Sequence, residues 1–228
     1  MTSGNRIGIL GGTFDPVHVG HLETALAAER ALGLDRVLVM PSGMPPHRHL
    51  QPFASAFHRF AMTAIAVTGL PALQVSDCEV REAGPSYTFD TLARLHQLGL
   101  DPLQIFFIAG ADAFAEIETW SRYPQVLDMA NFAVVSRPGH RASSLGSALP
   151  ALSGRMTDAA PSAASATQPA IFLVDAPTPD VSSTAVRQRL QEGRSIAGLV
   201  PPMVATYITQ HALYTSGRVN AAVGRSLA

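Results

Sequence analysis

Cysteine, net charge and long apolar runs are scarce in this sequence, and each scarcity excludes a class of protein. Cys78 is the only cysteine among 228 residues, so the chain cannot form an internal disulfide, and we expect a reducing compartment. The formal net charge is −1 at pH 7, which creates no strong field toward nucleic acid or membranes. No apolar run reaches the roughly 18 residues of a membrane span, and the first residues show no basic-then-apolar leader pattern. The expectation is a cytoplasmic protein that binds neither nucleic acid nor membranes.

Short apolar segments alternate with segments of helical periodicity, and 47% of the residues are hydrophobic, which is enough for one sizeable core. The expected strands lie at residues 7–10, 36–40, 73–77, 104–109, 132–136 and 171–174. The expected helices lie at residues 19–32, 55–68, 88–98 and 201–213, with shorter ones before Trp120 and after Ser182. This alternation predicts an α/β fold, a Rossmann-like, doubly wound parallel sheet with helices on both faces, in a single domain.

Two segments differ in composition from the rest of the chain. Residues 140–169 are rich in alanine, serine and proline, and we expect a flexible surface excursion there instead of a second domain. Residues 215–228 are small and polar, and we expect a disordered tail. The domain is therefore expected to span residues 1–214.

The most informative stretch is residues 11–22, G-G-T-F-D-P-V-H-V-G-H-L, which follows the first expected strand. A strand, a glycine turn and a helix start make a phosphate site, because the turn and the helix offer free N–H groups. The candidate contacts in the turn are Gly11, Gly12, Thr13 and Phe14. His18 and His21 share one helix face, where they would donate hydrogen bonds to phosphate oxygens. Two alternatives stay open: a zinc site, which would need a third ligand, and a tight turn followed by two surface histidines.

Further positions can serve a nucleotide. Ser183 and Thr184 begin a helix whose hydroxyls and amides accept an anion, and Arg187 lies one turn further along; an ordinary capped helix is the alternative. Asp112 follows the fourth expected strand, where it would either accept from ribose hydroxyls or cap the next helix. Arg48 lies in a proline-rich loop after the second expected strand, as a phosphate contact or as a solvated cation.

The segment at 11–22 resembles the signature of the nucleotidylyltransferases that carry an H-x-G-H element. Three more features extend the resemblance to one branch: S-S-T-x-x-R at 182–187, G-P-S-Y-T-F-D-T-L at 84–92, and Trp120 after G-A-D. Together, about residues 5–214 are similar to the bacterial nicotinate-nucleotide adenylyltransferases. The segment 140–169 is the main departure from that pattern.

This resemblance implies that AMP is transferred from ATP to nicotinate mononucleotide, which yields deamido-NAD and pyrophosphate in NAD biosynthesis. It implies catalytic roles for His18, His21, Arg48 and Arg187. Contacts to ATP are implied for the two phosphate motifs and the acid after the fourth strand: Gly11, Gly12, Thr13, Phe14, His18, His21, Asp112, Ser183, Thr184 and Arg187. Contacts to nicotinate mononucleotide are implied for Arg48, Tyr87, Thr88 and Trp120. Mg²⁺ is expected to arrive with ATP, without a metal ligand from the protein side chains.

Two rival functions stay open at this point. Pantetheine-phosphate adenylyltransferases share the H-x-G-H and S-S-T elements, but by resemblance they are shorter and lack the S-Y-T-x-D-T-L stretch. The other rival is a nucleotide-binding sensor that has the fold without turnover. The sequence also leaves open whether the chain forms a homo-oligomer.

Overall fold

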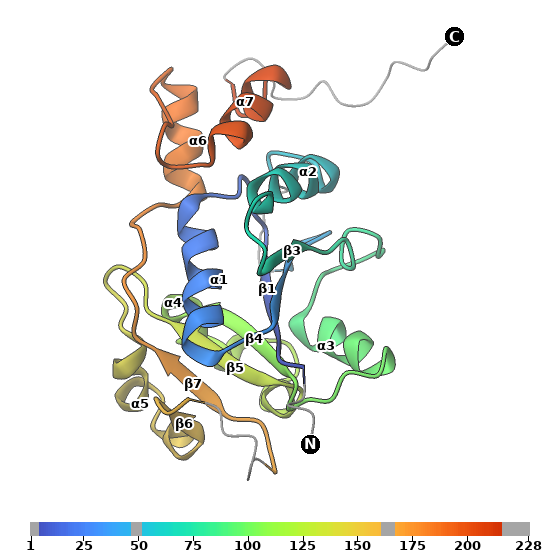
Figure 1. Cartoon of the computed structure of the whole chain (residues 1–228), viewed down its shortest axis with the longest axis vertical. Coiled ribbons are helices and arrows are strands. Elements are labelled where there is room, and N and C mark those ends of the chain that lie inside the picture. Colours follow the sequence, from blue (N-terminus) through green and yellow to red (C-terminus); the bar gives the residue numbers. More distant parts are fainter. Residues whose placement is uncertain (1–4, 47–51, 161–166, 216–228) are drawn as a thin grey trace.

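The apolar segments form one seven-stranded sheet in which neighbouring strands are parallel. The structure is a computed structural model and describes residues 5–46, 52–160 and 167–215, so that all but the first residue of the predicted tail lies outside it. The strands lie in the order β3 (Leu73–Val75), β2 (Arg36–Pro41), β1 (Ile7–Gly12), β4 (Ile105–Gly110), β5 (Asn131–Val135), β7 (Ile171–Val174) and β6 (Met156–Thr157). The predicted α/β class with a parallel sheet is confirmed (Figure 1).

Helices cover both faces of the sheet, and an apolar core forms on each side (Figure 1). The first core includes residues of α1 (Val19–Leu32), α2 (Ala56–Val67), α6 (Ser183–Gln191) and α7 (Pro202–Gln210). The second core includes residues of α3 (Thr88–Gln97), α4 (Ala111–Phe114), α5 (Leu145–Ala148) and the 3₁₀ helices η1 (Ile117–Thr119), η2 (Gln125–Asp128) and η4 (Pro150–Arg155). Because both faces are covered, β4 and β5 are apolar and buried along almost their whole length instead of alternating with polar residues.

α1 matches the helix predicted at residues 19–32. Gly33 ends it in the left-handed conformation, with a φ of 59°, and its N–H donates to the Glu29 carbonyl. At the other end His18 is the N-cap residue. Local sequence therefore sets both ends of α1, and it places the histidine face of this helix directly after β1.

The structure corrects the expectation for much of the segment 140–169. Residues 142–157 form η3 (Ala142–Ser144), α5, η4 and the edge strand β6, which pairs with β7. Leu145, Leu149 and Leu152 are buried in the second core. Their spacing of four and three residues suits one face of a helix, but the surrounding alanines, serines and prolines masked this signal.

The direction of the strand order reverses between β1 and β4, because the chain first runs from β1 through β2 to β3 and then continues on the other side of β1. In open parallel sheets, ligands bind at the carboxyl ends of the strands beside such a reversal. Gly12 ends β1 and Gly110 ends β4, so the segments that follow them open on the same edge. None of the helices in the described part of the chain is long and apolar enough to cross a membrane.

Candidate active site

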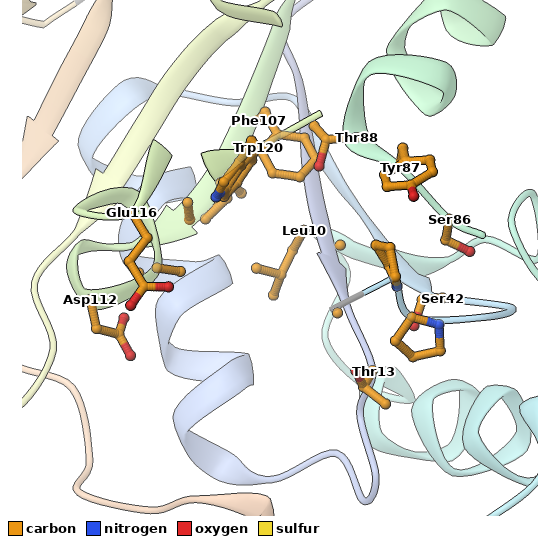
Figure 2. Close-up of a pocket in the computed structure, with 18 of the residues that line it drawn as sticks. Leu10, Thr13, Ser42, Ser86, Tyr87, Thr88, Phe107, Asp112, Glu116 and Trp120 are labelled. Atoms are coloured by element: carbon orange, nitrogen blue, oxygen red, sulfur yellow. The ribbon is translucent and has the colours of Figure 1, made fainter. Parts of the chain in front are cut away.

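A cavity of about 520 Å³ opens where β1 and β4 end (Figure 2). Most of the residues predicted from the sequence line it: Gly11, Gly12, Thr13, His21, Tyr87, Thr88, Asp112 and Trp120. The others that the structure describes lie outside the lining: Phe14, His18, Ser183, Thr184 and Arg187. Arg48 lies outside the described residues. The structure thus brings the two predicted ends of the site, a glycine turn and an aromatic wall, into one cavity.

The glycine turn belongs to the phosphate loop, which we define as residues 11–18. Arg59 of α2 is almost fully buried behind this loop, and its Nη1 donates to the Thr13 carbonyl at 2.7 Å. Its Nη2 donates to the Gly43 carbonyl at 3.0 Å, which joins the loops after β1 and β2. The N–H of a trans peptide points opposite to its C=O. The Phe14 N–H therefore points away from Arg59, so the buried guanidinium orients an amide that can serve an anion.

The two histidines of the loop and helix α1 stack on each other, with 3.6 Å between ring centroids and 21° between ring planes. The His18 backbone N–H donates to His21 Nδ1 at 3.2 Å, so a neutral His21 ring carries its proton on Nε2. Burial, with a contribution from Arg137, lowers the pKa of His18 from 6.5 to about 3. Burial, followed by His18 and Arg137, lowers the pKa of His21 well below 6.5. Both rings are neutral at pH 7, and His21 offers an N–H donor to the cavity that it lines.

The glycine between the histidines is closely packed against the side chains of His18 and Arg137. A Cβ at Gly20 would lie 3.1 Å from His18 Nδ1 and 3.3 Å from Arg137 Nη1. Arg137 follows β5, lines the cavity, and donates to the Gly20 carbonyl at 3.3 Å and to Thr24 Oγ1 at 3.4 Å. These hydrogen bonds are long, so the guanidinium can turn toward an anionic ligand at little cost. Sequence reasoning missed Arg137, although its place after a strand is the signal that drew attention to Asp112.

The zinc alternative finds no third ligand. Across residues 5–46, 52–160 and 167–215, no group of three or more His, Cys, Asp or Glu side chains could hold a metal ion. The surface alternative also fails, because His18 is only 2% exposed. The histidine pair is thus a stacked pair of rings beside the phosphate loop, with His18 buried.

The aromatic end of the cavity is built around Trp120. Its ring meets Phe107 edge-on, with centroids 5.8 Å apart, and meets Phe132 at 6.3 Å. Trp120, Phe107 and Thr88 lie together at one end of the cavity, with Thr13 toward the other end (Figure 2). A planar ring bound here would meet an aromatic wall whose orientation is fixed by its own packing.

Helix α3 begins at this aromatic end, at Thr88. The N-cap residue is Tyr87, which makes no side-chain capping hydrogen bond. Ser86 Oγ instead accepts from the Gly43 N–H at 3.0 Å, so Ser86 joins the loop after β2 to the start of α3. A helix start without a side-chain cap has N–H groups that an anion can accept from.

Asp112 and Glu116 lie on one side of the cavity, and both line it (Figure 2). The N-cap of α4 is Gly110, so Asp112 is not the cap that the sequence left as an alternative. Its carboxylate therefore remains available to hydroxyl donors such as those of a ribose. Glu116 was not predicted, and only its spacing of four residues from both Asp112 and Trp120 could have indicated it.

Comparison with known proteins agrees with this geometry. Residues 9–189 match the cytidylyltransferase-like family. The chain is 43% identical over 208 residues to a protein of Roseiflexus sp. (strain RS-1) described as a probable nicotinate-nucleotide adenylyltransferase, with 91% of this chain and 97% of that protein covered. The chain belongs to the nicotinate-nucleotide adenylyltransferases. A second member of this family, described in the same words, from Pectobacterium atrosepticum, is 38% identical over 205 residues and is matched over 96% of its length.

Solved structures confirm the fold of this family member. The Plasmodium falciparum nicotinic acid mononucleotide adenylyltransferase complexed with NaAD matches with a TM-score of 0.71 at 19% identity. The same enzyme complexed with APC matches with a TM-score of 0.69 at 18% identity. In both cases 92% of this chain and 97% of the other chain are covered. The single-domain nucleotidyltransferase fold is therefore shared over nearly the whole chain.

The arginine of the S-S-T-x-x-R motif supports the phosphate loop from outside the cavity. Arg187 is 7% exposed, and its Nη1 donates to the Asp15 carbonyl at 2.6 Å. Its Nη2 donates to Thr184 Oγ1 at 3.1 Å, and the Phe53 ring covers its guanidinium at 4.7 Å. The Oγ of Ser183 donates to the Pro16 carbonyl at 2.8 Å. This motif of the adenylyltransferase thus holds two carbonyls of the phosphate loop.

Proposed function

We propose that this chain transfers AMP from ATP to nicotinate mononucleotide and produces nicotinate adenine dinucleotide (deamido-NAD) and pyrophosphate. The observation that carries the proposal is that one cavity joins a phosphate loop to an aromatic wall with an uncapped helix start beside it. These two ends suit the two substrates, a polyphosphate and a flat ring that bears a carboxylate. Family membership gives the same reaction, which belongs to NAD biosynthesis.

The acceptor's own phosphate oxygen is the nucleophile in this reaction. Its second pKa is about 6, so it is largely a dianion at pH 7 and needs no strong general base. It attacks the α-phosphorus of ATP in line, the bond from the α-phosphorus to the α–β bridging oxygen breaks, and pyrophosphate leaves with that electron pair. The enzyme has to align two anions and stabilise the charge that develops on them.

Groups at the phosphate end supply that stabilisation. The Phe14 N–H, oriented by Arg59, and the neutral His21 Nε2–H donate to phosphate oxygens. Arg137 adds a cation whose present hydrogen bonds are long enough to exchange for a phosphate contact. Because neutral donors and one arginine are used, substrate binding requires no proton uptake by the histidines.

Mg²⁺ would be carried by the phosphates of ATP, where it neutralises charge on the leaving pyrophosphate. The described residues contain no cluster of three metal-ligating side chains. Asp15, the acid of the phosphate loop, is 0% exposed and its carboxylate already accepts from the Phe53 and Ala54 N–H groups. Asp112 and Glu116 line the cavity, where they would meet the water ligands of a metal that the nucleotide carries.

Selection of the acceptor is assigned to the aromatic end. Trp120 would stack on the pyridine ring, and the N–H groups at the start of α3 would donate to the carboxylate. A nicotinamide ring presents a neutral amide at that place, which gains less from the helix start. Nicotinate mononucleotide should therefore be used in preference to nicotinamide mononucleotide.

The test is pyrophosphate release with ATP and Mg²⁺, with nicotinate mononucleotide, nicotinamide mononucleotide and phosphopantetheine offered in parallel. Release with the first acceptor, at a kcat/KM at least about tenfold above the second, is expected from an ionic hydrogen-bonding difference. Equal kcat/KM for both mononucleotides would contradict the assigned acceptor pocket. Release with phosphopantetheine alone would agree with the proposed phosphate chemistry but would show that phosphopantetheine, and not nicotinate mononucleotide, is the acceptor. Tight ATP binding without release with any acceptor would favour the sensor.

A further inference from the structure

The last described residues of the chain reach the phosphate loop. Tyr214 follows α7 and is 8% exposed, and its hydroxyl donates to Asp15 Oδ1 at 2.8 Å across 199 positions of sequence. Asp15 lies in the middle of the phosphate loop and is 0% exposed. Neither residue lines the cavity, so this hydrogen bond lies behind the site described above.

The Asp15 carboxylate is a junction between three segments of the chain. Its Oδ2 accepts from the Phe53 N–H at 2.8 Å, and its Oδ1 accepts from the Ala54 N–H at 3.0 Å and from the Tyr214 hydroxyl. A buried carboxylate is tolerated only when its lone pairs are satisfied, and each lost donor leaves an uncompensated acceptor. The position of Asp15 therefore depends on all three donors, including the Tyr214 hydroxyl.

The same residue connects this junction to the phosphate-binding surface. The Asp15 main-chain carbonyl accepts from Arg187, and the Thr13 carbonyl two residues earlier accepts from Arg59. A displacement of Asp15 is thus passed to the Thr13–Phe14 peptide, whose N–H is the proposed phosphate donor. No comparable contact joins Tyr214 to the described residues at the aromatic end, Tyr87, Thr88 and Trp120.

The backbone near residue 214 adopts costly conformations to make this contact. Ala212 has a φ of 47° and Tyr214 has a φ of 62°, both in the left-handed region that residues with a side chain seldom occupy. Val204 and Ile208 of α7 are buried in the first core, which holds the helix that delivers Tyr214 in place. Burial and the adjacent Asp15 carboxylate raise the pKa of Tyr214, so its hydroxyl stays protonated and remains a donor.

We propose that Tyr214 is a positioning residue for ATP: through the buried Asp15 carboxylate it fixes the phosphate loop in the conformation that binds and aligns the triphosphate. The inference rests on the proposed adenylyl transfer. It assigns residues 211–215, which follow α7, to the support of the ATP end of the site and leaves the acceptor end independent of them.

The first test compares Tyr214→Phe with the matched control Tyr207→Phe. Tyr207 lies on α7, and its hydroxyl bonds to His58 Nδ1 at 2.9 Å, away from the phosphate loop, so both changes remove one hydroxyl contact. For Tyr214→Phe, the KM for ATP should rise about tenfold while the KM for nicotinate mononucleotide stays within about twofold. For Tyr207→Phe both constants should remain near those of the parent. Equal kinetic constants for the two variants would overturn the proposal. A lower kcat for Tyr214→Phe with both KM values unchanged would also overturn it, because that result means only that fewer molecules are folded.

A second measurement uses the unaltered enzyme, in case Tyr214→Phe fails to fold. Hydrogen exchange is followed with and without a non-hydrolysable ATP analogue, and coupling requires that ligand binding at the loop slows exchange at residues 207–215. Residues 145–152, which pack in the second core, are the control segment. Protection of residues 11–18 without any change at 207–215 would overturn the proposal. This measurement needs no turnover, so failure of the proposed reaction would be distinguished from failure of the Tyr214 assignment.

Discussion

His18 and His21 are neutral at pH 7, and their burial is the main reason. Burial is the largest cause of the lowered pKa of each ring, and the Arg137 guanidinium adds to it. The His18 N–H fixes the tautomer of His21, so its Nε2–H is presented to the cavity without a charge. This arrangement keeps a donor available over the physiological pH range, and it makes the folded state sensitive to acid.

The free energy of unfolding is expected to fall as the pH drops below 6.5. The unfolded chain takes up a proton on each histidine near the ordinary pKa of 6.5, whereas folded His18 does so only near 3. Above pH 6.5 neither state is protonated, so the effect is absent there. In His21→Asn one such proton is removed, and the slope of unfolding free energy against pH should be shallower below pH 6.5, because burial lowers the pKa of His21 in the folded state. Urea unfolding across this range measures both slopes.

The control for this prediction is His140→Asn, because His140 is exposed and outside the cavity lining. Carboxylates titrate in the same pH range in the parent, His21→Asn and His140→Asn. Only the difference between each variant and the parent in the slope of unfolding free energy against pH is therefore compared. An unchanged slope in His21→Asn, or the same change in His140→Asn, would contradict the assignment.

At the scale of elements, the sequence alone predicts a helix or strand where the residues that signal it lie within one segment. α1 was predicted at its observed residues, because helix-forming side chains are followed by a glycine that adopts a φ of 59°. The residues after β1 and β4 were placed in one cavity, because parallel strands end at the same edge of a sheet. The strand β6 was not predicted, since two residues carry no periodicity.

Contacts between distant segments explain what sequence patterns could not supply at the site. Arg59 bonds to Thr13 across 46 positions, and Tyr214 bonds to Asp15 across 199 positions. Neither residue belongs to a local motif, and a buried arginine in a helix reads as a surface residue until its partners are known. The motif residues could thus be named from the sequence, whereas the groups that orient them could not.

Arg155 is expected to matter for the stability of the α5–β6 segment and not for catalysis. Its Nη2 donates to the Leu127 carbonyl at 2.7 Å and to the Pro169 carbonyl at 3.1 Å, and its Nη1 bonds to Asp128 at 2.9 Å. Arg155→Ala leaves these acceptors without a donor, so the free energy of unfolding should fall by about 1–3 kcal/mol. Chemical denaturation measures this loss.

The matched control is Arg141→Ala, which removes an exposed arginine of the same segment. Steady-state constants of Arg155→Ala should equal those of the parent at temperatures where both proteins are folded, because Arg155 does not line the cavity. A changed KM for either substrate in Arg155→Ala would contradict the prediction that Arg155 has no part in catalysis. An equal loss of stability in Arg141→Ala would contradict the prediction that the hydrogen bonds of Arg155 stabilise the segment.

At the scale of the whole molecule, the basic residues are of one kind. The sequence has no lysine, so its 16 basic side chains of the Lys/Arg type are all arginines. Arginine stays charged at every accessible pH and binds phosphate through a planar fork of donors. The fixed positive charge for two anionic substrates is thus entirely guanidinium.

Chemical modification should reflect this composition. An amine-acylating reagent has no lysine to modify, so treatment is expected to leave kcat and both KM values unchanged. An arginine-selective dicarbonyl should inactivate the enzyme, and ATP should slow the inactivation because Arg137 lines the cavity. Activity assays and peptide mass mapping measure both effects. Rapid loss of activity with the acylating reagent, or inactivation by the dicarbonyl at the same rate with and without ATP, would contradict the prediction.

The position of β1 has a consequence for how the protein is made. This first strand lies between β2 and β4, and the loop after it takes hydrogen bonds from Ser183 and Arg187. Ribosomes deliver the chain from its N-terminus, so the phosphate loop emerges well before Ser183 and Arg187, which bond to it. In an unfinished chain the phosphate loop lacks the hydrogen bonds from Ser183 and Arg187, and one edge of β1 stays unpaired until β4 has been synthesised. Nascent chains therefore cannot bind ATP in the productive geometry before residues 183–187 have been synthesised.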